Sequence, residues 1–173
     1  MNDAVTEADR ATVARQLGRP PRALVAVAHR CPCGQPDVVE TSPRLEDGTP
    51  FPTLYYLTCP RATAAASRLE SAGRMREWQE QLATDAGLAA GYRAAHESYL
   101  ATRDAVDVLP TRMTAGGMPD RVKCLHALAG HALAAGPGVN PIGDRAVEEM
   151  GAWWAAGPCA QPAADDGGAE QEL

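Results

Sequence analysis

Residues 31–60 contain no alanine, although alanine is one of the commonest residues on both sides of this segment. The segment holds six of the fourteen prolines and three of the five cysteines of the 173-residue chain. Proline fixes φ and removes a backbone donor, whereas alanine is the strongest helix former. Residues 31–60 are therefore predicted to form short strands and turns, and the alanine-rich sequence around them is predicted to be largely helical.

Three short apolar runs predict β-strands in and just before this segment. They are Leu24–Val27, Val38-Val39 and Leu54–Leu57, which are rich in β-branched or aromatic residues. A turn at residues 46–49 precedes the last run. We expect a small, mostly antiparallel sheet of about three strands.

Helical spacing of apolar residues and capping residues predict four or five helices packed on this sheet, which defines an α+β fold. The expected helices run from Asp3 or Thr6 to Gln16, from Pro60 onward with a break near Gly73, over 88–106, from Pro119 to Ala135, and from Asn140-Pro141 onward. The expected domain organisation is an N-terminal tail and helix start at 1–15, a single α+β domain at 16–156, and a disordered acidic tail at 157–173.

The net charge of −6 comes from the two ends of the chain. Residues 1–9 carry three acidic side chains and residues 159–173 carry four, which leaves 15 acidic against 16 basic side chains between them. This balance, without a basic stripe interleaved with aromatic residues, argues against nucleic-acid binding. The chain contains no long apolar run and begins with an acidic segment, so we expect a cytoplasmic protein with no membrane span and with reduced cysteines.

Four of the five cysteines are predicted to converge at one edge of the sheet. Cys31 and Cys33 flank a proline where a strand should end, and Cys59 lies at the end of the third strand. Cys124 is placed in the first turns of the expected helix from Pro119. Thiolates bind zinc and iron-sulfur clusters, so these four cysteines are predicted to form a metal site with a regulatory or structural role.

An iron-sulfur cluster is favoured over zinc at this predicted site. Ligands spread over 31–124 do not match the paired CxxC pattern of zinc knuckles, whereas proline directly after a ligand cysteine recurs in bacterial ferredoxins. His29 is a possible substitute ligand. Cys159 falls in the predicted tail and is left out of the site.

An alternative hypothesis is a thiol- or anion-dependent hydrolase or transferase. Gly116-Gly117 precedes an expected helix that carries Arg121, Lys123, Cys124 and His126. Arg121 and Lys123 would bind an anion, and Cys124 would act as the nucleophile with a histidine such as His126 as its base. In a helix that begins at Pro119, however, His126 would lie about 200° around the axis from Cys124, so the two form a weak metal-binding pair.

A second alternative is a protein-interaction module in which the cysteines are incidental. Its partner would be an unidentified protein. Whether the chain is an enzyme stays open at this level. The Gly116-Gly117 loop matches neither of the phosphate-binding glycine motifs GxxxxGK[ST] and GxGxxG, which do not occur in the chain.

Three segments, RCPCGQPDVVETSPRLEDGTPFPTLYYLTCP, GGMPDRVKCLH and GPGVNPIGD, occur in order along the chain. Together they resemble the actinobacterial family called domain of unknown function 501, over about residues 16–151. Members of that family often lie beside genes for a septum-formation protein and an exopolyphosphatase, and some carry a septum formation initiator label for that reason. The resemblance implies a cell-division or envelope context by association and no activity.

Overall fold

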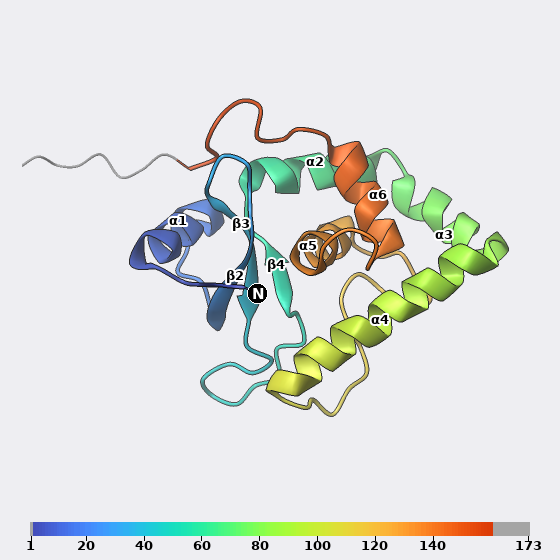
Figure 1. Ribbon diagram of the computed structural model, residues 1–173, viewed down its shortest axis with the longest axis horizontal. Coiled ribbons are helices and arrows are strands. Elements are labelled where there is room, and N and C mark those ends of the chain that lie inside the picture. The colour runs from blue at the N-terminus through green and yellow to red at the C-terminus, as the bar shows by residue number, and fades with distance from the viewer. Residues whose placement is uncertain (1, 161–173) are drawn as a thin grey trace, which may run out of the picture.

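The computed structural model describes residues 2–160, which form a four-stranded antiparallel sheet and six helices (Figure 1). The strands are β1 (Asp3–Ala4), β2 (Leu24–Arg30), β3 (Pro36–Thr41) and β4 (Tyr55–Leu57), in the order β1-β2-β3-β4. The α+β class and the three predicted strands are confirmed. β1 was not predicted, because two residues are too few to show an alternating pattern.

The helices agree with the predicted ones except at the start of α5. They are α1 (Glu7–Leu17), α2 (Pro60–Ser71), α3 (Arg74–Thr84), α4 (Ala86–Val106), α5 (Leu125–Ala135) and α6 (Pro141–Met150). The predicted break near Gly73 separates α2 from α3, because Gly73 adopts a left-handed φ of 86° that ends the first helix.

Capping side chains fix where α1 and α6 begin. The Thr6 hydroxyl accepts a hydrogen bond from the Asp9 amide, and the Asp9 carboxylate accepts one from the Thr6 amide, so the pair forms a capping box. Asn140 caps α6 by accepting a 2.9 Å hydrogen bond from the Gly143 amide, directly before Pro141 at the first helical position.

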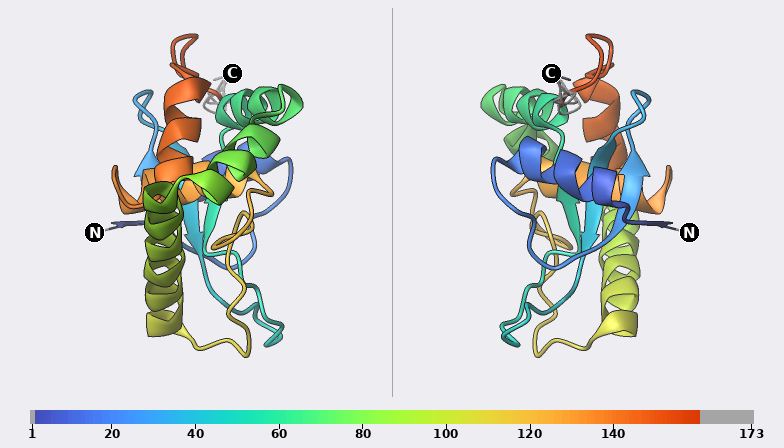
Figure 2. Two further views of the ribbon diagram at one scale, coloured as in Figure 1. Left: turned by 90° about the vertical axis from the view of Figure 1, so that its right-hand side faces the viewer. Right: turned by 90° about the vertical axis from the view of Figure 1, so that its left-hand side faces the viewer.

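The sheet lies between helices on both of its faces. α1 crosses one face, which Figure 2 (right) shows toward the viewer, and α5 packs on β2, β3 and β4 from the other side. α2 and α6 cover α5 in turn, so α5 is the central helix of the molecule (Figure 1). Leu125, Leu128 and Ala129 of α5 are fully buried, and burial of each leucine side chain contributes about 1.5–3 kcal/mol to folding.

α5 and α6 approach each other closely at Gly143. A Cβ atom at this position would lie 2.8 Å from the Ala132 Cβ and would overlap the Leu128 carbonyl. Glycine is therefore required at this crossing for steric reasons.

The predicted helix from Pro119 is wrong in its first turns. The backbone after Pro119 is not helical until Leu125, because side chains from other helices form hydrogen bonds with its backbone amide and carbonyl groups. The Tyr92 hydroxyl donates a 2.9 Å hydrogen bond to the Arg121 carbonyl, and the Val122 amide donates a 2.8 Å bond to the Gln79 side chain. The helix therefore starts later than its sequence pattern indicates.

None of the helices described is long and apolar enough to cross a bilayer. The described chain ends at Ala160, so most of the predicted disordered tail, 161–173, lies outside the described residues. The first part of that tail, 157–160, is described and is hydrogen-bonded to the rest of the protein: Arg61 donates to the Gly157 carbonyl, and the Ala160 amide donates to the Gln35 side chain.

Candidate functional site

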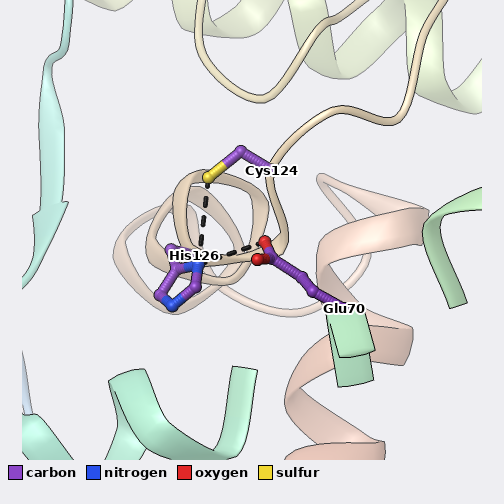
Figure 3. Close-up of side chains that lie close together, drawn as sticks. All are labelled: Glu70, Cys124 and His126. Carbon is purple, nitrogen blue, oxygen red and sulfur yellow. Dashed lines mark hydrogen bonds and ion pairs between the residues drawn. The ribbon is translucent and has the colours of Figure 1, made fainter. Parts of the chain in front are cut away.

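Cys124 is the residue directly before α5, and its backbone is extended, with φ −154° and ψ 108°. Because Cys124 is not inside the helix, the side chain of His126 lies on the same side as its thiol. Cys124 Sγ is 3.9 Å from His126 Nδ1 (Figure 3). The expectation that these two residues point in opposite directions was wrong, since it assumed a helix that already contained both.

Glu70 in the last turns of α2 completes the group. Its Oε1 atom accepts a 2.7 Å hydrogen bond from the Leu125 amide and lies 3.1 Å from His126 Nδ1. Glu70 thus supplies the capping acceptor that the Cys124 side chain does not provide for α5. Figure 3 shows Glu70 reaching from α2 to the start of α5.

The second ring nitrogen of His126 also has hydrogen-bond partners. Nε2 lies 3.1 Å from the Thr63 carbonyl and 3.1 Å from the Ser67 hydroxyl. A carbonyl oxygen only accepts, so Nε2 carries a hydrogen, and the carboxylate of Glu70 requires a hydrogen on Nδ1 for the same reason. The surroundings of His126 therefore favour the imidazolium form, with a proton on both nitrogens.

The electrostatics of this group agree with its geometry. The pKa of His126 is raised to about 9, first by its hydrogen bond to Cys124 and then by the charge of Glu70, against the effect of burial. The pKa of the Cys124 thiol is lowered, first by His126 and further by the Ala127 backbone amide, although burial opposes this. Both shifts favour a thiolate–imidazolium pair near neutral pH.

Cys124 and His126 form part of the wall of a pocket of about 700 Å³. The pocket lies between β4, the start of α2 and the start of α5, and Gln16 and Leu17 at the end of α1 also line it. Among the described residues that line it, none is Lys, Arg, Asp or Glu. His126 and Glu70 are 26% and 23% exposed, so small molecules can reach the group.

The structure does not place the predicted anion-binding residues at this pocket. Arg121 and Lys123 are exposed on the surface and do not line it. Their backbone amides close the turn after the glycine pair: Arg121 donates to the Gly117 carbonyl and Lys123 donates to the Gly116 carbonyl, at 2.9 and 2.7 Å. The glycines therefore form a turn of their own and do not lead directly into the helix.

The four predicted metal ligands are not brought together as one compact group. Within residues 2–160, Glu70, Cys124 and His126 form the one group of three or more His, Cys, Asp or Glu side chains whose ligand atoms all lie within 4.8 Å of one another. Cys31, Cys33 and Cys59 are not in that group. Sulfur atoms around a single zinc ion lie closer than this limit, because each bond is about 2.3 Å long.

His29, the possible substitute ligand, is engaged elsewhere. Its Nδ1 atom lies 2.7 Å from Oδ1 of the fully buried Asp37. Glu70 was missed in the sequence because it occurs among alternating Arg and Glu residues that resemble a solvated helix face. Its distance of 54 residues from Cys124 also left no local motif.

The fold and the site define an α+β protein in which a glutamate contacts a histidine and lies beside a cysteine, and the cysteine and histidine line a pocket. Residues 27–148 match the family described as protein of unknown function (DUF501), so the chain belongs to this family, as the resemblance indicated. No curated protein and no solved structure shows a significant match to the chain.

Proposed function

We propose that this protein is a thiol-dependent enzyme that transfers or hydrolyses an acyl group through Cys124. The observation that carries the proposal is the 3.9 Å approach of the Cys124 thiol to a histidine whose two nitrogens are both held by acceptors. A nucleophile, a base and a third group that orients the base are the parts that activate a cysteine. All three meet here beside a pocket.

The chemistry follows from the positions of these atoms. The Cys124 thiolate attacks the carbonyl carbon of the substrate, and the electron pair of the C=O bond moves onto the oxygen. When this pair returns, the bond to the leaving group breaks, and His126 gives its Nδ1 proton to that group. Water then attacks the thioester, loses a proton to His126 and releases the acid and the thiolate.

Glu70 is a positioning residue in this scheme. Its carboxylate orients the imidazole and stabilises its positive charge, while the same oxygen atom fixes the start of α5 through Leu125. The hydrogen bond from His126 Nε2 to the Thr63 carbonyl holds the ring from its other side. The ring is therefore fixed before a substrate binds.

The pocket favours an acyl group without charge. Its wall combines apolar side chains such as Leu57 and Ala127 with the hydroxyl groups of Thr53, Thr63 and Ser67. No charged side chain other than His126 lies among the described residues of the wall to pair with a charged acyl chain. Burying an unpaired charge there would be unfavourable.

The test uses a panel of short p-nitrophenyl esters and alkyl thioesters with the full chain. We expect a burst of one equivalent of leaving group, and a mass increase located on Cys124 by peptide mass spectrometry. Cys124→Ser should abolish both, and Cys33→Ser, a matched change outside the pocket, should leave them intact. Labelling that is independent of Cys124 would overturn the proposal.

Metal analysis distinguishes the proposed thiol enzyme from a protein in which Cys124, His126 and Glu70 bind a metal ion. One equivalent of bound zinc or iron that is lost in both Cys124→Ser and Glu70→Gln would assign a metal ion to the group and contradict the thiolate mechanism. Unchanged behaviour of Cys124→Ser in every assay would instead favour the protein-interaction module. The cell-division or envelope role stays a prediction that rests on the family resemblance.

A further inference from the structure

Three separate parts of the chain meet at the end of the sheet opposite the long loop before β4. They are the β2–β3 turn, the start of α2 and the last described segment after α6. In Figure 1 this last segment runs from α6 above α2 to the β2–β3 turn. Each of the three parts carries cysteine: Cys31 and Cys33 in the turn, Cys59 directly before α2, and Cys159 in the last segment.

Backbone hydrogen bonds place Cys31 and Cys59 on either side of the start of β3. The Cys31 amide donates a 2.9 Å bond to the Gln35 carbonyl, and the Thr58 amide, one residue before Cys59, donates a 2.8 Å bond to the Asp37 carbonyl. Adjacent strands lie about 4.8 Å apart, so the backbones of these two cysteines are separated by about two strand spacings. Both side chains are buried in the same hydrophobic core.

Cys159 is fixed next to this turn by side-chain hydrogen bonds. Its thiol donates to Gln35 Oε1 at 3.2 Å and accepts from Gln16 Nε2 at 3.1 Å. Gln35 also accepts from the Ala160 amide at 3.1 Å and donates to the Ala160 carbonyl. The segment that carries Cys159 is therefore docked on the CPCGQ turn by bonds to both ends of one glutamine side chain.

The thiols form two neighbouring pairs. Cys33 is the neighbour of the Cys31 thiol within the turn, and Cys159 is the neighbour of the Cys59 thiol at the start of α2. Cys33 and Cys159 also pack against the core cluster that contains Cys31 and Cys59.

We propose that Cys31, Cys33, Cys59 and Cys159 bind one thiophilic metal centre, with Cys159 in the place that the sequence assigned to Cys124. Thiolate is the ligand preferred by zinc and by iron-sulfur clusters, and binding releases the four thiol protons to solvent. No three of these sulfurs all lie within 4.8 Å of one another, as the sulfurs around one zinc ion would, so the centre that we assign here is an iron-sulfur cluster.

This centre is independent of the thiol chemistry proposed for Cys124. Cys124 has Glu70 and His126 as its neighbours, and neither of these residues takes part in the four-cysteine group. The centre would tie the segment after α6 to the β2–β3 turn. Its role is then structural, or regulatory through loss of the metal.

The test is purification of the full chain without oxygen, followed by iron, acid-labile sulfide and zinc analysis and an absorption spectrum. Iron with acid-labile sulfide and a visible band supports the proposal, whereas one equivalent of zinc without iron would contradict it. Cys159→Ser should lose both the iron and the sulfide. Cys124→Ser is the matched control and should keep both.

Two further measurements exclude a trivial loss of metal through misfolding. The Cys159→Ser variant should keep the far-ultraviolet circular dichroism of the parent, because the substitution lies outside every helix and strand. Gln35→Ala, which removes no sulfur but detaches Cys159, should also weaken metal retention. A protein without metal, or one whose metal depends on Cys124 and not on Cys159, would overturn the proposal.

Discussion

The carboxylate of Glu70 accepts a 2.7 Å hydrogen bond from the amide of Leu125, 55 residues further along the chain. The same oxygen lies 3.1 Å from His126. One atom of α2 therefore both caps α5 and fixes the charge of the histidine beside Cys124. Loss of this carboxylate would therefore affect both the start of α5 and the candidate site.

This relationship predicts different effects for two substitutions of Glu70. Glu70→Gln keeps an oxygen that can accept from Leu125 but removes the negative charge, so the pKa of His126 should fall from about 9. Glu70→Ala should also leave the Leu125 amide without its acceptor and destabilise the protein by about 1–2 kcal/mol. Histidine NMR titration and urea unfolding measure the two effects, and an unchanged His126 pKa in Glu70→Gln would contradict the assignment.

Alkylation of Cys124 should depend on pH differently from that of an ordinary thiol. His126 lowers the pKa of Cys124, so the midpoint of the alkylation rate with iodoacetamide should lie at a lower pH than that of an ordinary thiol. His126→Gln should move this midpoint upward and slow the reaction at pH 7. Peptide mass spectrometry isolates the Cys124 signal, and urea-unfolded protein is the reference. Equal midpoints in the folded and unfolded states would rule out an activated thiol.

From the burial of the His131 side chain we predict how the folding stability depends on pH. It is buried between Tyr55 and Tyr99, and its Nδ1 atom accepts from the Asn140 amide group at 3.2 Å. Burial lowers its pKa to about 4. The unfolded chain binds a proton at this residue near pH 6.5, whereas the folded chain does not, so stability is complete above pH 6.5 and falls as the pH drops toward 4.

The loss of stability due to His131 amounts to about 3 kcal/mol over this range of pH. His131→Phe keeps an aromatic ring between the two tyrosines and cannot be protonated. It should lower stability at pH 7, because Asn140 loses an acceptor, but the difference from the parent should shrink or reverse toward pH 4. Urea unfolding at several pH values measures this, and a constant difference would show that His131 does not cause the acid sensitivity.

The close packing of α5 against α6 predicts that one added methyl group at Gly143 will destabilise the protein. Gly143→Ala should destabilise the protein by about 1–3 kcal/mol, because the new Cβ would overlap the backbone of α5. Gly87→Ala is a matched control in the first turn of α4, where the added Cβ contacts the Asp85 carboxylate at 3.3 Å. That change should be close to neutral in thermal unfolding. Similar losses for the two variants would argue against close packing at Gly143.

Most of the fold could be predicted because its signals are local. Proline and alanine content separated the sheet segment from the helices, and Gly73 and Asn140 marked a helix end and a helix start where the structure has them. The start of α5 could not be predicted in this way. It depends on Tyr92, Gln79 and Glu70, which reach the 121–125 backbone from other helices and leave no trace in the local pattern.

The candidate site was predicted only in part for the same reason. Cys124 was expected as a metal ligand or, in the alternative hypothesis, as a nucleophile with His126 as its base. Glu70 was assigned to a solvated face and Cys159 was assigned to a tail. Both assignments relied on neighbours in the sequence. The contacts of Glu70 and Cys159 join residues 55 and 124 apart, so only the three-dimensional structure reveals them.

The docking of Cys159 on Gln35 also has a consequence for protein synthesis. Gln35 and its turn leave the ribosome long before Cys159 is translated, because Cys159 lies 124 residues further along the chain. The sheet and helices can fold while the turn still lacks this covering segment. This end of the sheet is therefore the last part of the described molecule to be completed, because it needs the segment around Cys159.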